Sequence, residues 1–386
     1  MGMSESDQGK EGNMVVGNGM GAGKVSSDKD PLINNNQAEP PTKSMSGEKK
    51  TVVQIATVVL SYWTISISMV FANKYLLGGK HSESDISLFV AWFQCLVTVF
   101  SVIIGTYTSR ICRGSDAKIP LVSQKVLLSK NMLILSALFV GMLTFNNLCL
   151  KHVGVAFFQV ARSLTLIFTV IFSALILGKP QSKQTIGCCL IVVSGFCLGV
   201  NQEGIAGTLS YRGVIYGVTT SLFVSLVGIF TKRALELVEK DVVKVTFYNN
   251  VNSAVMFIPL VIATSQLMVV FQEKSSDITF WIFLILSGML SFLIGWASNM
   301  QIDYTSPITH HISNNTKAVL QTVIAVLWYQ ETKLFLWWCS NLLVITGAFL
   351  YAMVKMREQR ALASSTATIS AMEAGENDTK NGVQKA

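Results

Sequence analysis

Long apolar runs separated by short polar links fill the chain from about residue 51 to residue 356. Each run is close to the ~20 residues that a helix needs to cross a bilayer. Backbone groups within hydrocarbon must be bonded inside the protein, so we expect helices rather than strands. The predicted spans are 52–77, 86–108, 127–150, 155–177, 184–202, 213–232, 245–270, 279–301, 306–329 and 334–355. The sequence therefore predicts an all-α membrane protein with ten transmembrane helices.

The two ends of the chain lack this pattern. Residues 1–50 and 357–386 are rich in small and polar residues and have few large apolar ones, so neither segment can bury a core. We predict a disordered N-terminal tail at 1–50, a ten-span domain at 51–356 and a disordered C-terminal tail at 357–386.

Composition and charge agree with a membrane protein. Only 13% of the 386 residues are charged, about half the share of an average soluble domain. The net charge of +8 does not indicate nucleic acid, because the Lys and Arg residues lie in short links between apolar runs. About seventeen of them fall on the side of the two termini and about five on the opposite side. This asymmetry places both termini in the cytosol and favours an even number of spans.

The fourth and ninth predicted spans resemble each other. Each carries a cation within the span, Arg162 or Lys317, and from this cation the chain runs apolar to a short polar turn. The span that follows carries a late glycine, Gly195 in one case and Gly347 in the other. Equivalent positions in two halves of five spans predict two inverted five-helix repeats, because five is an odd number of crossings. Inverted repeats are typical of transporters that bind a substrate near the membrane midplane.

Lys317, Arg162 and Lys74 are cations within predicted spans. A cation at the bilayer centre costs roughly 3 kcal/mol or more on insertion scales. The carboxylates fall in links or at span ends: Asp85, Asp116, Glu203, Glu236, Glu239, Asp241, Glu273, Asp277, Asp303 and Glu331. A water-filled cavity that receives an anion removes the difficulty, and a phosphate group suits such a site because Arg binds its oxygens bidentately and Lys acts as a point charge. Lys74 lies near a span end, so the alternative that it only extends to the lumenal surface stays open.

Further polar side chains complete the candidate site. Ser313, Asn314 and Asn315 precede Lys317, and the run Tyr248-Asn249-Asn250 opens the seventh span. An amide both donates and accepts, so it can recognise a nucleobase edge or sugar hydroxyls. Tyr248 can stack on a base or donate to a phosphate.

The sequence predicts no catalytic group, cofactor or metal site. The seven cysteines lie in or beside apolar runs and form no CxxC pair, so we interpret them as packing residues. His310 and His311 are adjacent on a helix and diverge, so they cannot chelate one metal ion.

Six stretches of the chain carry a resemblance to a known family. The stretches are 66–77, 144–157, 162–165, 202–204, 246–251 and 305–317, and they include Phe-Tyr-Asn-Asn at 247–250. Together they resemble the nucleotide-sugar transporter family of the drug/metabolite transporter superfamily, over about 63–351.

The resemblance implies a ten-span Golgi antiporter that moves GDP-fucose from cytosol to lumen in exchange for GMP. It also implies that Tyr248, Asn249 and Asn250 bind the nucleoside and that Lys317 contacts the phosphate and sugar end. Asn314 replaces the glycine that relatives carry before this lysine. Its side chain must fold aside or take part in recognition, and this leaves the sugar less defined than the nucleotide.

Several alternatives stay open at this point. The Phe-Tyr-Asn-Asn motif also occurs in GDP-mannose transporters, and a triose phosphate is another phosphorylated substrate. An ion-coupled drug exporter would need a carboxylate inside a span, and a membrane enzyme would need a base and a metal site. The lipid bilayer is the expected surrounding, no nucleic acid is expected, and a homodimer is an open alternative.

Overall fold

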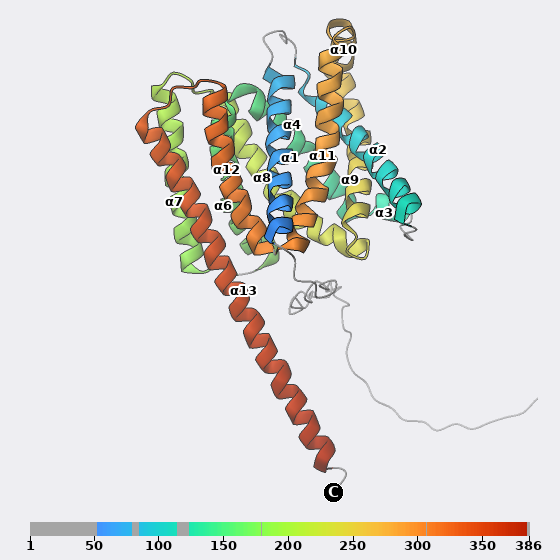
Figure 1. Ribbon diagram of the computed structural model, residues 1–386, viewed down its shortest axis with the longest axis vertical. Helices are drawn as coiled ribbons and strands as arrows, with labels where there is room; N and C mark the ends of the chain where they lie inside the picture. The colour runs from blue at the N-terminus through green and yellow to red at the C-terminus, as the bar shows by residue number, and fades with distance from the viewer. Residues whose placement is uncertain (1–51, 79–84, 114–122, 179, 306, 384–386) are drawn as a thin grey trace, which may run out of the picture. The chain divides into compact units, whose positions relative to one another are not determined.

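The computed structural model describes residues 52–78, 85–113, 123–178, 180–305 and 307–383, and these residues form helices and their connections (Figure 1). The helices are α1 (Val52–Gly78), α2 (Ser87–Arg113), α3 (Gln124–Leu127), α4 (Lys130–His152), α5 (Val155–Arg162), α6 (Thr165–Leu177), α7 (Lys183–Ile205), α8 (Tyr211–Leu237), α9 (Val242–Ala263), α10 (Gln266–Glu273), α11 (Ile278–Tyr304), α12 (Pro307–Trp328) and α13 (Phe335–Val383). The prediction of an all-helical membrane protein is confirmed.

Nine stretches of the described chain are long and apolar enough to cross a membrane. Eight of them lie in α1, α2, α4, α7, α8, α9, α11 and α13, and the ninth covers α5 and α6 together. The ninth predicted span, 306–329, corresponds to α12, which is long enough but is not among the nine stretches. Its polar residues, His310, Asn314, Asn315, Lys317 and Gln321, lower its hydropathy.

The fourth predicted span is interrupted directly after Arg162. The amide of Ser163 donates to the carbonyl of Val160, and the amide of Leu164 donates to that of Ala161. These three-residue bonds form a short 3₁₀ turn between α5 and α6. The turn ends α5 at Arg162, so the guanidinium projects from a break in the span rather than from a continuous helix.

Helices α7 and α13 lie side by side and antiparallel (Figure 1). A Cβ built on Gly195 would lie 2.9 Å from both the carbonyl oxygen of Ser340 and the amide nitrogen of Val344. Such contacts leave no room for a side chain, so the two backbones approach each other closely, as small residues permit within membranes.

The glycine of the partner helix makes the same contact in return. A Cβ on Gly347 would lie 3.1 Å from both the carbonyl oxygen of Cys188 and the amide nitrogen of Val192. Each glycine therefore meets the residues three and seven positions before the other glycine. This reciprocity relates α7 and α13 by a local two-fold axis across the pair.

Two elements differ from the prediction. The seventh span was expected at 245–270, but α9 ends at Ala263 and a separate helix, α10, follows. Ser265, between them, adopts a left-handed conformation with φ 54°, which ends α9.

The C-terminal segment is the second difference. Residues 357–386 were expected to be disordered, but α13 continues through Val383 (Figure 1). The stretch 356–374 contains neither Gly nor Pro and is rich in Ala, Met, Glu and Arg, all of which favour helix. The predicted N-terminal tail at 1–50 lies outside the described residues.

Candidate functional site

Lys317 lies near the middle of α12, and the groups of α1 that it contacts in the described residues are neutral. Its Nζ donates to the hydroxyl of Ser66 at 2.5 Å and lies 4.9 Å from the ring centroid of Tyr62. A tyrosine face attracts a cation electrostatically, but weakly compared with a carboxylate. No ion pair of the described residues involves Lys317.

Arg162 approaches the same group from the end of α5. It is near enough to both Tyr62 and Lys317 for their charges to interact. Arg162 is exposed although many protein atoms surround its guanidinium. Within the described residues Arg162, like Lys317, has no acidic partner.

Asn314 lies beside this pair and bonds across to α1. Its Oδ1 accepts a hydrogen bond from the hydroxyl of Tyr62 at 2.6 Å, and its Nδ2 donates to Nε2 of His310 at 3.0 Å. The side chain of Asn314 therefore takes part in the site. It holds the ring of Tyr62 under the ammonium of Lys317.

Ser313 joins three helices next to this site. Its hydroxyl accepts from Nε1 of Trp63 in α1 and from Nε2 of Gln301 in α11, both at 2.7 Å. Oε1 of Gln301 accepts from Nδ1 of His310 at 3.0 Å. These bonds hold α1, α11 and α12 together around Lys317.

Asn315 points elsewhere. Adjacent residues of a helix are rotated by about 100°, so Asn315 cannot share the face of Asn314 and Lys317. It lines a groove of about 540 Å³ with Trp63 and residues of α12 and α13. The rest of the lining is Thr316, Val319, Leu320, Val323, Ile345, Thr346, Phe349 and Leu350.

The α9 motif forms a second polar group. Asn249 and Asn250 are buried, with side chains 7% and 6% exposed. Oδ1 of Asn249 accepts from the hydroxyl of Ser136 in α4 at 3.1 Å, and the hydroxyl of Tyr248 accepts from the amide of Ser123 at 3.4 Å. In the described residues the bonds of both asparagines reach α4 or stay within α9, so neither amide bonds to the Lys317 group.

Lys74 is not part of the Lys317 group. Its Nζ donates to the carbonyls of Leu150 and Val153, both at 2.7 Å, where α4 ends. Lys74 is eight residues beyond Ser66 on α1, about 12 Å along the axis. A lysine bonded to the last carbonyls of a helix stabilises its negative end, so the contacts of Lys74 are those of a cap.

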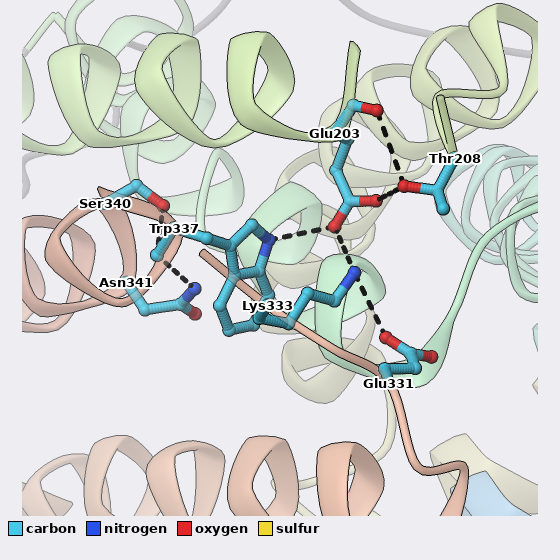
Figure 2. A network of polar contacts seen from close by, with 7 residues as sticks. All are labelled: Glu203, Thr208, Glu331, Lys333, Trp337, Ser340 and Asn341. Atoms are coloured by element: carbon cyan, nitrogen blue, oxygen red, sulfur yellow. Dashed lines mark hydrogen bonds and ion pairs between the residues drawn. The ribbon is translucent and has the colours of Figure 1, made fainter. Parts of the chain in front are cut away.

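A third polar group lies where α7 ends and α13 begins (Figure 2). Oε1 of Glu203 accepts from Nζ of Lys333 at 2.6 Å and from Nε1 of Trp337 at 2.8 Å, and Thr208 donates to Oε2. Glu331 lies 3.1 Å from the same Nζ. We call these five residues the Glu203 network. Glu203 is buried in the last turn of α7, at the end of the span, as the sequence predicted.

Tyr62 and Ser66 are the site residues that the sequence interpretation missed. They are four residues apart and therefore share one face of α1. Asn73, further along that helix, is also buried and polar, and it accepts from Nε2 of Gln94 at 2.8 Å. The signal in the sequence was a row of polar side chains on one face of an otherwise apolar span.

A helical membrane chain with an unneutralised pair of deep cations has the features of a carrier for anions. Residues 53–352 match the Triose-phosphate Transporter family, and the chain belongs to that family. It is a membrane transporter of the nucleotide-sugar type and not an enzyme, as the motifs predicted.

Curated relatives cover most of the chain. The GDP-fucose transporter of Caenorhabditis elegans is 46% identical over 305 residues, which are 79% of this chain and 83% of that protein. GDP-fucose transporter 1 of Mus musculus is 45% identical over 318 residues, 81% and 87% of the two chains. A protein of Drosophila melanogaster named "GDP-fucose transporter, Golgi" is 37% identical over 310 residues, 79% and 91% of the two chains.

Proposed function

We propose that this protein is a GDP-fucose:GMP antiporter of the Golgi membrane that carries the nucleotide sugar from cytosol to lumen. The observation that carries the proposal is the pair Lys317 and Arg162, which lie near enough for their charges to interact and have no acidic partner in the described residues. The names of the relatives support the substrate, and the Drosophila melanogaster relative supports the location.

The pair suits a diphosphate. Arg162 has no acidic partner in the described residues, so its fork of N–H groups can bind two phosphate oxygens. When the substrate binds, Nζ of Lys317 leaves the hydroxyl of Ser66 and the ring of Tyr62 and contacts a third phosphate oxygen. The substrate then supplies the negative charge that no described residue provides at this pair.

The nucleoside end is assigned to the α9 motif. Tyr248, Asn249 and Asn250 lie on a helix other than those that carry Lys317 and Arg162. A long substrate, with a base at one end and a sugar at the other, fits two separated polar groups. Ser313 and Asn314, next to Lys317, are placed for the sugar end.

The fold proposed for this activity is the ten-span arrangement of two inverted five-helix repeats, with α12 as the ninth span. The reciprocal contacts of Gly195 and Gly347 support it, because α7 and α13 are then the fifth helices of the two repeats. The break after Arg162 supports it too, since interrupted helices are common at transporter binding sites. Positive residues favour cytosolic termini.

Coupling by exchange follows from the charges. An empty carrier that closes around Lys317 and Arg162 buries two cations without an anion, at a cost of several kcal/mol. A loaded carrier closes around a neutralised site. The carrier therefore crosses readily with GDP-fucose or GMP bound and slowly without either.

Uptake of labelled nucleotide sugars into proteoliposomes loaded with GMP tests the proposal. GDP-fucose should enter faster than GDP-mannose, UDP-sugars or triose phosphates, and its entry should require internal GMP. Equal uptake without internal GMP would contradict exchange, and preference for another substrate would contradict the assigned specificity.

A further inference from the structure

The link between α4 and α5 is held by charged side chains from two other parts of the helix bundle. From α1, Nζ of Lys74 donates to the carbonyls of Leu150 and Val153, both at 2.7 Å. From the link between α12 and α13, the carboxylate of Glu331 lies against Gly154, where a Cβ would be only 2.6 Å from Oε1. The absent side chain of Gly154 leaves room for this carboxylate. One short link therefore joins α1 to the end of α12.

The charge of Glu331 is available for this contact. Nζ of Lys333 lies 2.6 Å from Glu203 and 3.1 Å from Glu331, so Glu203 already balances it (Figure 2). Glu331 is also near enough to Lys74 for their charges to interact. Opposite charges attract more strongly in partly buried surroundings than in water, because water screens them less. Lys74 and Glu331 therefore draw two parts of the bundle toward the same link.

Aromatic and apolar side chains close the same end of the bundle. The ring of Phe71 in α1 stacks on that of Tyr329, with centroids 6.0 Å apart and planes 4° apart. The centroid of Trp328 lies 6.5 Å from that of Phe71. Phe71 also packs against a buried cluster that includes Val153 of the link and Ala325 of α12. The ends of α1, α4 and α12 are thus packed together.

This closed end lies on one side of the cation pair. Lys74 is eight residues beyond Ser66 on α1, and Gly154 is eight residues before Arg162, about 12 Å in each case. On the other side of the pair, the side-chain hydrogen bonds of α6 in the described residues stay within α6 or reach the link that follows it. Among the described residues, the bonds that join α1 to α4 and α5 therefore gather at the end where α4 stops.

We propose that Lys74 and Glu331 form the lumenal gate of the carrier and hold the binding site closed toward the lumen while it takes up GDP-fucose from the cytosol. The inference rests on the proposed function, because α4 and α12 end at the lumenal surface only if both termini are cytosolic. Release into the lumen requires Lys74 to leave the carbonyls of the link and Glu331 to leave Gly154. The two side chains stabilise one of two alternating states and do not bind the substrate.

Half-saturation by GMP from each side of the membrane tests the inference. The full-length protein is inserted into liposomes in one orientation, and exchange of labelled for unlabelled GMP is measured with saturating GMP on the opposite side. Lys74→Met removes the charge and keeps the length of the side chain. The ratio of the cytosolic to the lumenal half-saturating concentration should rise by about tenfold or more, because a charge-assisted contact made only in the lumen-closed state is lost.

Lys151→Met is the matched control. Lys151 lies beside the same link, but its ion pair with Asp85, at 3.4 Å, is partly exposed and does not involve α1 or α12. An exposed pair contributes little, so the ratio should stay within about twofold. If Lys74 bound the substrate, both half-saturating concentrations would rise together, and if it were only a helix cap, the amount of folded protein would fall. An unchanged ratio in Lys74→Met would therefore overturn the inference, and so would an equal rise in Lys151→Met.

Gly154→Ala decides the question if Lys74→Met is not recovered as folded protein. Its Cβ displaces the carboxylate of Glu331 in the lumen-closed state, so the ratio should rise by about threefold or more. An unchanged or lower ratio would overturn the inference. Absence of GMP exchange in the unaltered protein would instead contradict the proposed function, so the two failures are distinguishable.

Discussion

Two partly buried lysines of this protein have opposite surroundings. Nζ of Lys333 lies 2.6 Å from Glu203 and 3.1 Å from Glu331, whereas Nζ of Lys317 contacts a hydroxyl and an aromatic ring. The first charge is neutralised within the protein, and the second has no acidic partner among the residues that the structure describes. A neutralised charge needs no ligand, so it joins helices, while a charge without a counter-ion is suited to bind one. Burial of the side chain alone does not separate these two roles.

The largest effect is expected at Lys317. Lys317→Ala should lower GDP-fucose:GMP exchange by about a hundredfold, because a charge-assisted contact to phosphate contributes roughly 1.5–3 kcal/mol. The melting temperature of the purified protein should stay the same or rise, since the substitution removes an uncompensated cation. Exchange in proteoliposomes and thermal unfolding in detergent measure the two effects. A protein that unfolds more easily but still exchanges would reverse the roles assigned to the two lysines.

The opposite pattern is expected at Lys333. Lys333→Ala leaves Glu203 buried without its cation, and breaking a buried ion pair costs about 3–5 kcal/mol. The melting temperature should fall clearly, while the apparent KM of the protein that remains folded changes little. Adding Glu203→Gln should recover part of the loss, because the uncompensated carboxylate is then gone. A double variant no more stable than Lys333→Ala would contradict the ion-pair interpretation.

A smaller effect is expected at the contact between α7 and α13. Gly195→Ala places a Cβ 2.9 Å from the backbone of α13 and should destabilise the protein by about 1–3 kcal/mol. Gly347→Ala should cost a similar amount, because its contacts are reciprocal. Gly187→Ala, also in α7, is the control, because a Cβ at this position would meet no atom within 4 Å. Unequal effects at Gly195 and Gly347 would weaken the two-fold relation between the helices.

The smallest effect is expected at Tyr62. Tyr62→Phe keeps the ring under Lys317 but loses the bond to Asn314, a change of about 0.5–1.5 kcal/mol. The apparent KM for GDP-fucose should rise by about threefold to tenfold, with the maximal rate little changed. Tyr62→Leu removes the ring as well and should have the larger effect. Equal KM values in the two variants would show that the ring does not support Lys317.

Most of the fold follows from local pattern. Apolar runs, their lengths and their polar links identified nearly every helix, because a chain in hydrocarbon has to satisfy its backbone within each span. The separate helix α10 and the continuation of α13 were missed. Both depend on where a helix stops, and a single left-handed residue such as Ser265 decides that.

The residues of the site likewise divide into those that the sequence identified and those that only the structure revealed. Lys317 and Arg162 were recognisable because a cation within an apolar run is costly wherever the run folds. Their neighbours were not, because Tyr62 is 255 residues from Lys317 along the chain and meets it only when α1 packs against α12. Asn315 and Lys74, expected at the site, point to other surroundings because helix rotation and axial distance separate them from Lys317.

The sequence by itself thus determined the membrane class, the helices and the presence of cations within spans. Each of these properties depends on a short segment and the solvent around it. Which cation has a counter-ion was decided only by packing. Glu203 and Lys333 are 130 residues apart and form a pair, while Lys317 and Arg162 come together without an acid. Electrostatic energy depends on distance in space, and that distance exists only once the helices are assembled.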